Sequence, residues 1–298
     1  MGRVRSVNQD VYGDFENADG YRLLVVADGM GGHAGGETAS RLALETVERI
    51  FARDFGEPDT LLARAFRAAN DEIRRVGASD PALRGMGTTA VALLIGPLDE
   101  AWVAHVGDSR AYRLREGRFD RITEDHSWVR EAIRLGEITA DEAREHPMKN
   151  VLLRSIGTTP GVEASIATID LKPQDRFLLC SDGLWGEVDD RTIAEVLARE
   201  SPSSAVAELV DRANANGGSD NVTVQVAALL GADGESSGMK GADGRAGAAN
   251  RSGPNALPAP RGDALRTPLL GELHRWSRPA VIAAGLLAAA ALFWRVCA

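Results

Sequence analysis

Acidic residues beside turn-forming residues recur in this sequence at points where apolar runs begin or end. They are Asp28-Gly29, Asp108-Ser109, Asp182-Gly183 and Asp220-Asn221, with Asp10 in a polar turn near the N-terminus. A carboxylate at the end of a buried strand is costly unless a positive charge compensates it. Mg²⁺ and Mn²⁺ prefer oxygen ligands, which include carboxylates, backbone carbonyls and water. Two such ions about 3.5–4 Å apart can hold a hydroxide for in-line attack on phosphorus.

Other interpretations of these residues are weaker. A single Asp-Gly pair is usually a plain turn, so only the recurrence of such pairs points to a site. Residues 29–34 fit a loose dinucleotide-binding pattern, G-x-G-x-x-A, but Asp28 would bring a negative charge to the pyrophosphate. The five histidines lack metal-ligand spacing, which disfavours zinc, and Ser109 is not in a nucleophile elbow.

The elements that position these aspartates follow from the spacing of apolar residues. An apolar run from Tyr21 to Asp28 predicts a buried strand, and helical spacing predicts helices over 37–55 and 59–77. Further strands are predicted at 90–95, 101–106, 111–114, 118–122, 162–171, 176–180 and 221–230, and further helices at 128–135, 140–145, 192–199 and from 201 onward. Strands and helices are grouped rather than alternating, which favours an α+β fold over a doubly wound sheet.

The net charge of −9 is unevenly distributed along the chain. Residues 231–298 hold 8 basic and 5 acidic residues, so residues 1–230 hold 26 and 38 and carry −12. An acidic body argues against nucleic acid as a partner and suits cation binding. Cys180 and Cys297 suggest no disulfide framework, and the N-terminus lacks the apolar core of a signal peptide. We therefore expect the body to lie in a reducing compartment.

The composition changes after residue 230. Residues 231–275 are rich in Gly, Ala, Pro and Ser and are predicted to be a flexible linker. Residues 276–298 contain an apolar run, Pro279–Trp294, with tryptophans and arginines on both sides. We expect a C-terminal transmembrane helix, with a buried globular helix as the alternative. Arginines on its near side place the body in the cytoplasm, so the expected location is the cell membrane, with a single pass.

Six short motifs follow one another along residues 1–230. They are Arg5-Ser6-Val7-Asn8-Gln9-Asp10, Ala27–His33, Gly85–Thr89, Gly107-Asp108-Ser109-Arg110, Cys180–Leu184 and Ser219–Thr223. Together they resemble the ordered motifs of the metal-dependent protein phosphatases (PPM, type 2C) in their bacterial form. The resemblance implies a central β-sandwich of two antiparallel sheets flanked by helices on both faces, an α-β-β-α arrangement. It also implies hydrolysis of phosphoserine and phosphothreonine by a hydroxide that bridges two Mn²⁺ or Mg²⁺ ions.

The resemblance assigns a metal-binding role to five residues of the core site. Asp28 matches the carboxylate that bridges the two metal ions, and Gly29 matches a ligand that binds through its backbone carbonyl. Asp182 and Asp220 match the other direct carboxylate ligands. Asp10 matches a residue that holds metal-bound water.

Three further features follow from the same resemblance. Asp108 matches a ligand of a third ion, Arg5 matches the arginine that grips the substrate phosphate, and residues 125–150 match a mobile flap beside the active site. Gln9 stands where many relatives have Glu. Met30 stands where eukaryotic relatives have a histidine proposed as proton donor, so the general acid is unassigned.

The chain also departs from the family pattern at its start, because the first edge strand and its Ser-Asp-x-Gly are missing. This departure motivates a rival hypothesis, a catalytically weak, membrane-tethered module that binds phosphoproteins. The expected partners are phosphoproteins, including receptor-like serine/threonine kinases and their substrates. Binding of a dinucleotide is a distant third hypothesis.

Overall fold

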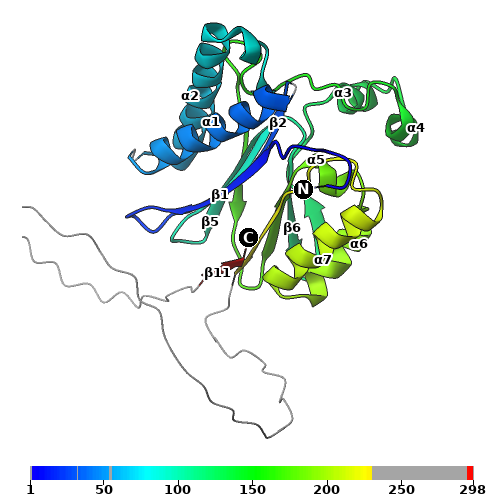
Figure 1. Cartoon of the computed structure of the whole chain (residues 1–298). Helices are drawn as coiled ribbons and strands as arrows, with labels where there is room; N and C mark the ends of the chain where they lie inside the picture. Colours follow the sequence, from blue (N-terminus) through cyan, green and yellow to red (C-terminus); the bar gives the residue numbers. More distant parts are fainter. Residues whose placement is uncertain (1, 32, 54–55, 230–293, 298) are drawn as a thin grey trace, which may run out of the picture. The chain divides into compact units, whose positions relative to one another are not determined.

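The computed structural model describes residues 2–31, 33–53, 56–229 and 294–297. The strands in these ranges form two antiparallel sheets (Figure 1). The six-stranded sheet has the order β1-β2-β4-β5-β8, with β3 paired to β2. Its strands are β1 (Asp10–Glu16), β2 (Arg22–Met30), β3 (Gly87–Thr88), β4 (Ala90–Ile95), β5 (Glu100–Val106) and β8 (Ser165–Asp170).

The second sheet has five strands in the order β11-β10-β9-β6-β7. They are β6 (Arg110–Arg115), β7 (Arg118–Arg121), β9 (Arg176–Cys180), β10 (Val224–Leu229) and β11 (Trp294–Cys297).

The two sheets pack face to face because their central strands are apolar on both sides. In β2, Leu24 and Val26 belong to a buried cluster that also contains Phe177 and Leu179 of β9. Leu23 and its alternate neighbours face the other way, into a cluster with the helices on the outer side. A strand buried on both faces reads in sequence as a continuous apolar run, which is why β2 is predictable.

Helices cover the outer face of each sheet (Figure 1). α1 (His33–Phe51) and α2 (Pro58–Ser79) pack on the six-stranded sheet, while α6 (Asp190–Arg199) and α7 (Pro202–Ala215) pack on the five-stranded sheet. A 3₁₀ turn, η1 (Pro81–Leu83), follows α2. The prediction of an α+β sandwich with helices on both faces is thereby confirmed.

The predicted flap contains two short helices, α3 (Trp128–Arg134) and α4 (Ala140–Glu145), as the sequence indicates. Ser127 caps α3 through the backbone N–H of Arg130, and Thr139 forms a capping box with Glu142 in α4. The indole of Trp128 stacks on the ring of His146, with centroids 4.7 Å apart. This stacking joins the start of α3 to the residue that ends α4.

The sequence prediction differs from the structure in the first 20 residues, where it expects no regular element. β1 occupies residues 10–16 and pairs along its whole length with β2. Its seven residues, DVYGDFE, bury only Asp10 and Gly13 fully, so the strand lacks the apolar run or the strict alternation that would have predicted it.

The predicted membrane segment also differs at its end. Residues 294–297 form β11, in which Trp294 is the register partner of Leu229 and Cys297 that of Val226. The remainder of the predicted linker and anchor lies outside the described residues. Among the residues described, no helix is both long enough and apolar enough to cross a membrane.

The core between the sheets gives a direct test of this packing. Phe177 is fully buried there, so Phe177→Ala should lower the free energy of unfolding by about 3–5 kcal/mol. Leu98, whose side chain is 77% exposed, supplies the matched control Leu98→Ala, which should change it by less than about 0.5 kcal/mol. Urea unfolding followed by tryptophan fluorescence measures both. Equal losses in the two variants would contradict the packing described.

Candidate active site

Antiparallel pairing brings the ends of several strands to one edge of the sandwich. Asp10 at the start of β1 is the register partner of Asp28 near the end of β2. In the other sheet, Cys180 at the end of β9 pairs with Arg110 at the start of β6 and with Val224 at the start of β10. The turns that carry Asp108, Asp182 and Asp220 therefore reach the same edge.

A cleft of about 390 Å³ lies at this edge. Its walls contain six of the seven residues to which the sequence assigns a role at the site. They also contain Asn150, at the end of the predicted flap. The lining residues are Arg5, Ser6, Val7, Gln9, Asp28, Gly29, Met30, Gly31, Thr89, Asp108, Asn150, Leu152, Asp182 and Asp220. The seventh, Asp10, lies behind this wall.

Asp10 is held in place from the second sheet. The hydroxyl of Ser181 donates to Asp10 Oδ2 at 2.7 Å and accepts from the backbone N–H of Thr223 at 3.1 Å. Asp10 Oδ1 is buried and has no hydrogen-bond partner among the described residues. Ser181 thus connects the two sheets through a single carboxylate, and one oxygen of that carboxylate stays available for a ligand.

The backbone around Asp28 is fixed by the threonines of the Gly85–Thr89 motif. The carbonyl of Asp28 accepts from the backbone N–H of Thr89 at 2.8 Å and from the hydroxyl of Thr88 at 2.7 Å. Thr89 Oγ1 also lies 2.7 Å from Ser109 Oγ, next to Asp108. These bonds fix the ends of β2 and β5 relative to each other.

Gly29 and Gly107 meet steric demands that other residues would not. A Cβ on Gly29 would lie 2.1 Å from the carbonyl oxygen of Gly36, so the close approach of α1 to the end of β2 needs a glycine there. Gly107 has a φ of +100°, and a Cβ on it would lie 2.6 Å from Thr89. The two glycines let the backbone beside Asp28 and Asp108 approach closely.

Burial of several like charges raises the pKa values of the carboxyls at this edge. The pKa of Asp28 is raised well above its usual value by burial and then by the charges of Asp10 and Asp182. The pKa of Asp182 rises to about 6, through burial and then through Asp220 and Asp10. Burial, followed by the charge of Asp182, raises the pKa of Asp108 to about 7. The group therefore resists ionisation unless a cation joins it.

Arg5 is the single positively charged side chain among the described residues that line the cleft. It is 53% exposed and donates from Nη2 to Asp220 Oδ2 at 2.7 Å. An exposed ion pair of this kind contributes little to stability and leaves the guanidinium free to exchange partners. Arg5 thus lies at the mouth of the cleft with a planar fork of donors that fits a phosphate.

The chemistry of these donors fits a hard divalent cation. Within the described ranges, Oδ1 of Asp10 and Oδ1 of Asp182 are buried without hydrogen-bond partners. In the described part of the chain, no three acidic, histidine or cysteine side chains are arranged closely enough to hold one ion by themselves. A site with few protein ligands suits Mg²⁺ or Mn²⁺, which keep several waters, better than Zn²⁺.

Sequence reasoning missed the polar residues that hold the carboxylates in place. Besides Ser181, Asn221 accepts from the backbone N–H of Gln9 at 2.8 Å through Oδ1. Trp185 donates from Nε1 to the carbonyl of Asp108 at 3.0 Å. Ser181 and Asn221 stand directly beside Asp182 and Asp220 in the motifs, and this adjacency is the available signal for them.

The comparisons with known proteins agree with this geometry. The family model described as protein phosphatase 2C matches residues 3–230. The chain belongs to the protein phosphatase 2C family. The serine/threonine phosphatase Stp of Listeria monocytogenes is 39% identical over 232 residues, which cover 75% of this chain and 90% of the relative. PstP of Mycobacterium tuberculosis is 40% identical over 234 residues, or 77% of this chain and 43% of PstP.

Solved structures extend the comparison to the fold. The serine/threonine phosphatase of S. agalactiae matches with a TM-score of 0.72 and 36% identity, over 76% of this chain and 94% of that one. The catalytic domain of PstP, solved in complex with two manganese ions, matches with a TM-score of 0.67 and 37% identity, over 76% and 92%. The predictions of the family and of a metal-dependent serine/threonine protein phosphatase are confirmed.

The raised pKa values predict how stability depends on pH in the metal-free protein. Between the ordinary carboxyl pKa near 3.8 and the folded values of about 6 and 7, the folded state binds more protons than the unfolded chain. The free energy of unfolding therefore falls as the pH rises through this window.

Asp182→Asn removes one of the repelling charges. In EDTA at pH 7.5 the variant should melt about 2–4 °C above the wild type, and this difference should be smaller at pH 4.5, where Asp182 is protonated in the folded wild type. Mn²⁺ should raise the melting temperature of the wild type more than that of the variant. Scanning calorimetry measures all three comparisons. A metal-free variant that melts below the wild type by the same amount at both pH values would contradict charge repulsion as the cause.

Proposed function

We propose that the cleft removes phosphate from phosphoserine and phosphothreonine side chains of proteins, and that its carboxylates hold two Mn²⁺ or Mg²⁺ ions. Asp28, Asp182, Asp220 and the carbonyl of Gly29 would bind these ions, with Asp10 holding water beside them. Asp108 would bind a third ion. The observation that carries this proposal is the group of buried carboxylates Asp28, Asp108 and Asp182, because Arg5, the one cationic side chain among the described residues of the cleft, is paired with Asp220 instead. When bound, divalent ions supply the compensating charge and acidify water for attack on phosphorus.

Arg5 has a separate role at the mouth of the cleft. Its guanidinium donates to Asp220 and is half-exposed. A phosphate can therefore replace Asp220 as its partner without desolvating a buried charge. Two oxygens of the phosphate would accept the two parallel N–H groups of the fork. Arg5 thereby orients the phosphorus toward the carboxylate group, which lies deeper in the cleft.

The described lining residues of the cleft offer no evident general acid to protonate the leaving serine or threonine oxygen. Met30 lies in the cleft wall at the position after Asp28-Gly29, and the described lining residues include no histidine, lysine, tyrosine or cysteine. We assign this proton to solvent water in the cleft. With this assignment, the carboxylates of the cleft bind the metal ions and Arg5 orients the phosphate ester.

The test of this function is metal-dependent phosphate release from a phosphothreonine peptide by the full chain. We expect release with Mn²⁺, none with EDTA, and a fall of at least about 100-fold in kcat for Asp28→Asn. Arg5→Ala should mainly raise KM, because the phosphate loses its exposed partner. A folded protein that binds Mn²⁺ and phosphopeptide but releases no phosphate would instead establish the rival binding module.

We further propose that residues 1–230 form the phosphatase domain, that 231–275 link it to the membrane, and that 276–298 anchor it there. The body would lie on the cytoplasmic side of the cell membrane, and phosphorylated receptor-like kinases and their substrates would be its partners. The apolar run 279–294 and the arginines before it support the anchor. A tether would raise the local concentration of membrane-bound substrates.

Two variants test the anchor, and the second of them keeps every strand of the five-stranded sheet. Deleting residues from Arg275 onward should move the protein from the membrane fraction of a cell lysate to the soluble fraction. The double variant Leu286→Arg, Leu287→Arg should do the same while it keeps Trp294–Cys297, which form β11. A full chain found in the soluble fraction would refute the anchor and favour the pairing of β11 with β10.

A further inference from the structure

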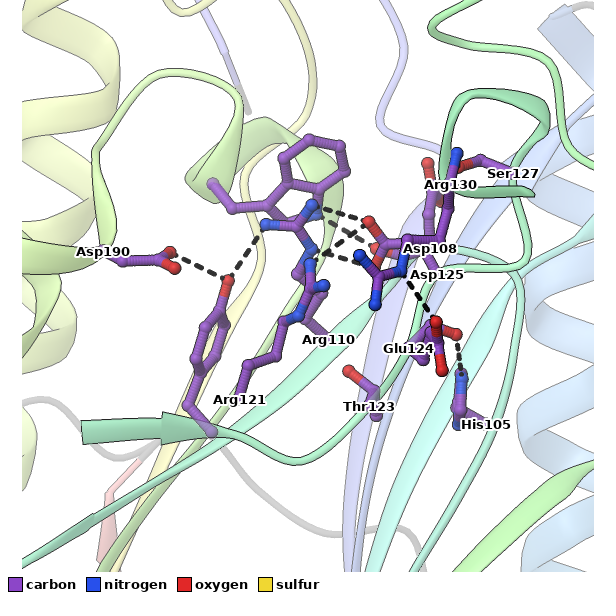
Figure 2. A network of polar contacts seen from close by, with 12 residues as sticks. His105, Asp108, Arg110, Arg121, Thr123, Glu124, Asp125, Ser127, Arg130 and Asp190 are labelled. Carbon is purple, nitrogen blue, oxygen red and sulfur yellow. Dashed lines mark hydrogen bonds and ion pairs between the residues drawn. The ribbon is translucent and has the colours of Figure 1, made fainter. Parts of the chain in front are cut away.

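A polar network beside the cleft centres on Arg110, the first residue of β6 (Figure 2). Its Nε and Nη2 donate to the two carboxylate oxygens of Asp125 at 3.0 and 2.6 Å. Nη1 donates to the hydroxyl of Tyr112 at 3.1 Å, and that hydroxyl donates to Asp190 at 3.2 Å. The Arg110 and Asp125 side chains are only 12% and 9% exposed. All three nitrogens of the guanidinium are therefore engaged.

The face of the same guanidinium is also in use. Its central carbon lies 3.6 Å from the centroid of the Trp185 ring. Trp185 is the last residue of α5 (Asp182–Trp185), the short helix that begins with the proposed metal ligand Asp182. The indole Nε1 donates to the carbonyl of Asp108 at 3.0 Å. Trp185 thus connects the two proposed ligands, and the guanidinium of Arg110 packs on its ring.

Three segments that are distant in sequence meet at this one side chain. They are the turn with Asp108, the helix α5 with Asp182 at its start, and the root of the flap at Asp125. A planar fork that also stacks on an indole fixes distance and orientation together. A displacement of Arg110 would therefore move the flap root and the two carboxylates relative to one another.

We propose that Arg110 is a positioning residue, which sets the spacing of Asp108 and Asp182 and fixes the root of the flap against them. The inference rests on the proposed function, in which these two aspartates bind the catalytic ions. In the described structure, Arg110 forms no ion pair with Asp108 or Asp182; its ion pair is with Asp125. It acts through Trp185 and Asp125.

The same strand offers a matched comparison. Arg115, the last residue of β6, also holds a buried aspartate with two parallel bonds, to Asp175 at 2.7 and 2.6 Å. Asp175 is fully buried and precedes the start of β9, whereas Arg110 pairs with the end of β9. The two arginines are five residues apart, about 16 Å along the strand. Both support the sheet, but only Arg110 adjoins the cleft.

The experiment compares Arg110→Lys with Arg115→Lys in the full chain. A lysine keeps the charge and loses both the fork and the stacking plane. Calorimetric titration with Mn²⁺ gives the dissociation constants, and p-nitrophenyl phosphate hydrolysis gives kcat and KM. We expect Arg110→Lys to weaken Mn²⁺ binding and lower kcat by about 10-fold each, with KM changed by less than about twofold. Arg115→Lys should leave all three within about twofold, although both variants lower the melting temperature.

Trp185→Phe provides a second variant, because it keeps an aromatic ring under Arg110 and removes the N–H that bonds to Asp108. It should weaken Mn²⁺ binding in the same direction as Arg110→Lys, by about threefold or more. The inference is overturned if Arg110→Lys binds Mn²⁺ and turns over like the wild type. It is also overturned if Arg115→Lys shows the same losses, since Arg110 would then be merely structural. A wild type without Mn²⁺-dependent turnover would instead overturn the proposed function.

Discussion

The burial of several aspartates of like charge at one end of the sandwich is the constraint on which the rest of the structure depends. Burial, followed by the charges of neighbouring aspartates, raises the pKa values of Asp28 and Asp182, so the metal-free fold is destabilised by keeping them ionised. The same repulsion among the aspartates favours the binding of a divalent ion, which would relieve it. The surrounding sheets must therefore be stable enough to hold the carboxylates in place before the ion arrives.

The apolar layers supply that stability through strands that are buried on both faces. β2 and β4 pack against α1 and α2 on one side and against β9 and β10 on the other. The side chains of such strands are closely packed on both faces, and this packing holds the strand ends in place. Asp28 follows directly from a run of this kind, which gives a costly carboxylate a rigid support.

Much of this arrangement could be predicted from the sequence, and the limits have a physical basis. The continuous run Leu23–Ala27 marked β2, and the recurrence of aspartates beside small residues marked the cleft. β1 was missed because its sequence, DVYGDFE, has neither an apolar run nor a strict alternation of apolar and polar residues. The bond of Ser181 to Asp10 could not be predicted, because it joins residues 171 positions apart; only the adjacency of Ser181 to Asp182 pointed to this serine. Motif order supplied what spacing alone could not, namely that the aspartates converge.

Arginine partners distinguish the structural aspartates from those of the cleft. The side chain of Asp125 is 9% exposed and Asp175 is fully buried, and each accepts two parallel bonds from an arginine of β6. In the described structure, no arginine or lysine forms an ion pair with Asp28 or Asp182. At the cleft, the described ion pair of Arg5 is with Asp220, so the charges of Asp28 and Asp182 are left for a divalent cation to compensate. The absence of an arginine partner is thus a property of the site, and it becomes visible only when the ion pairs of the structure are compared.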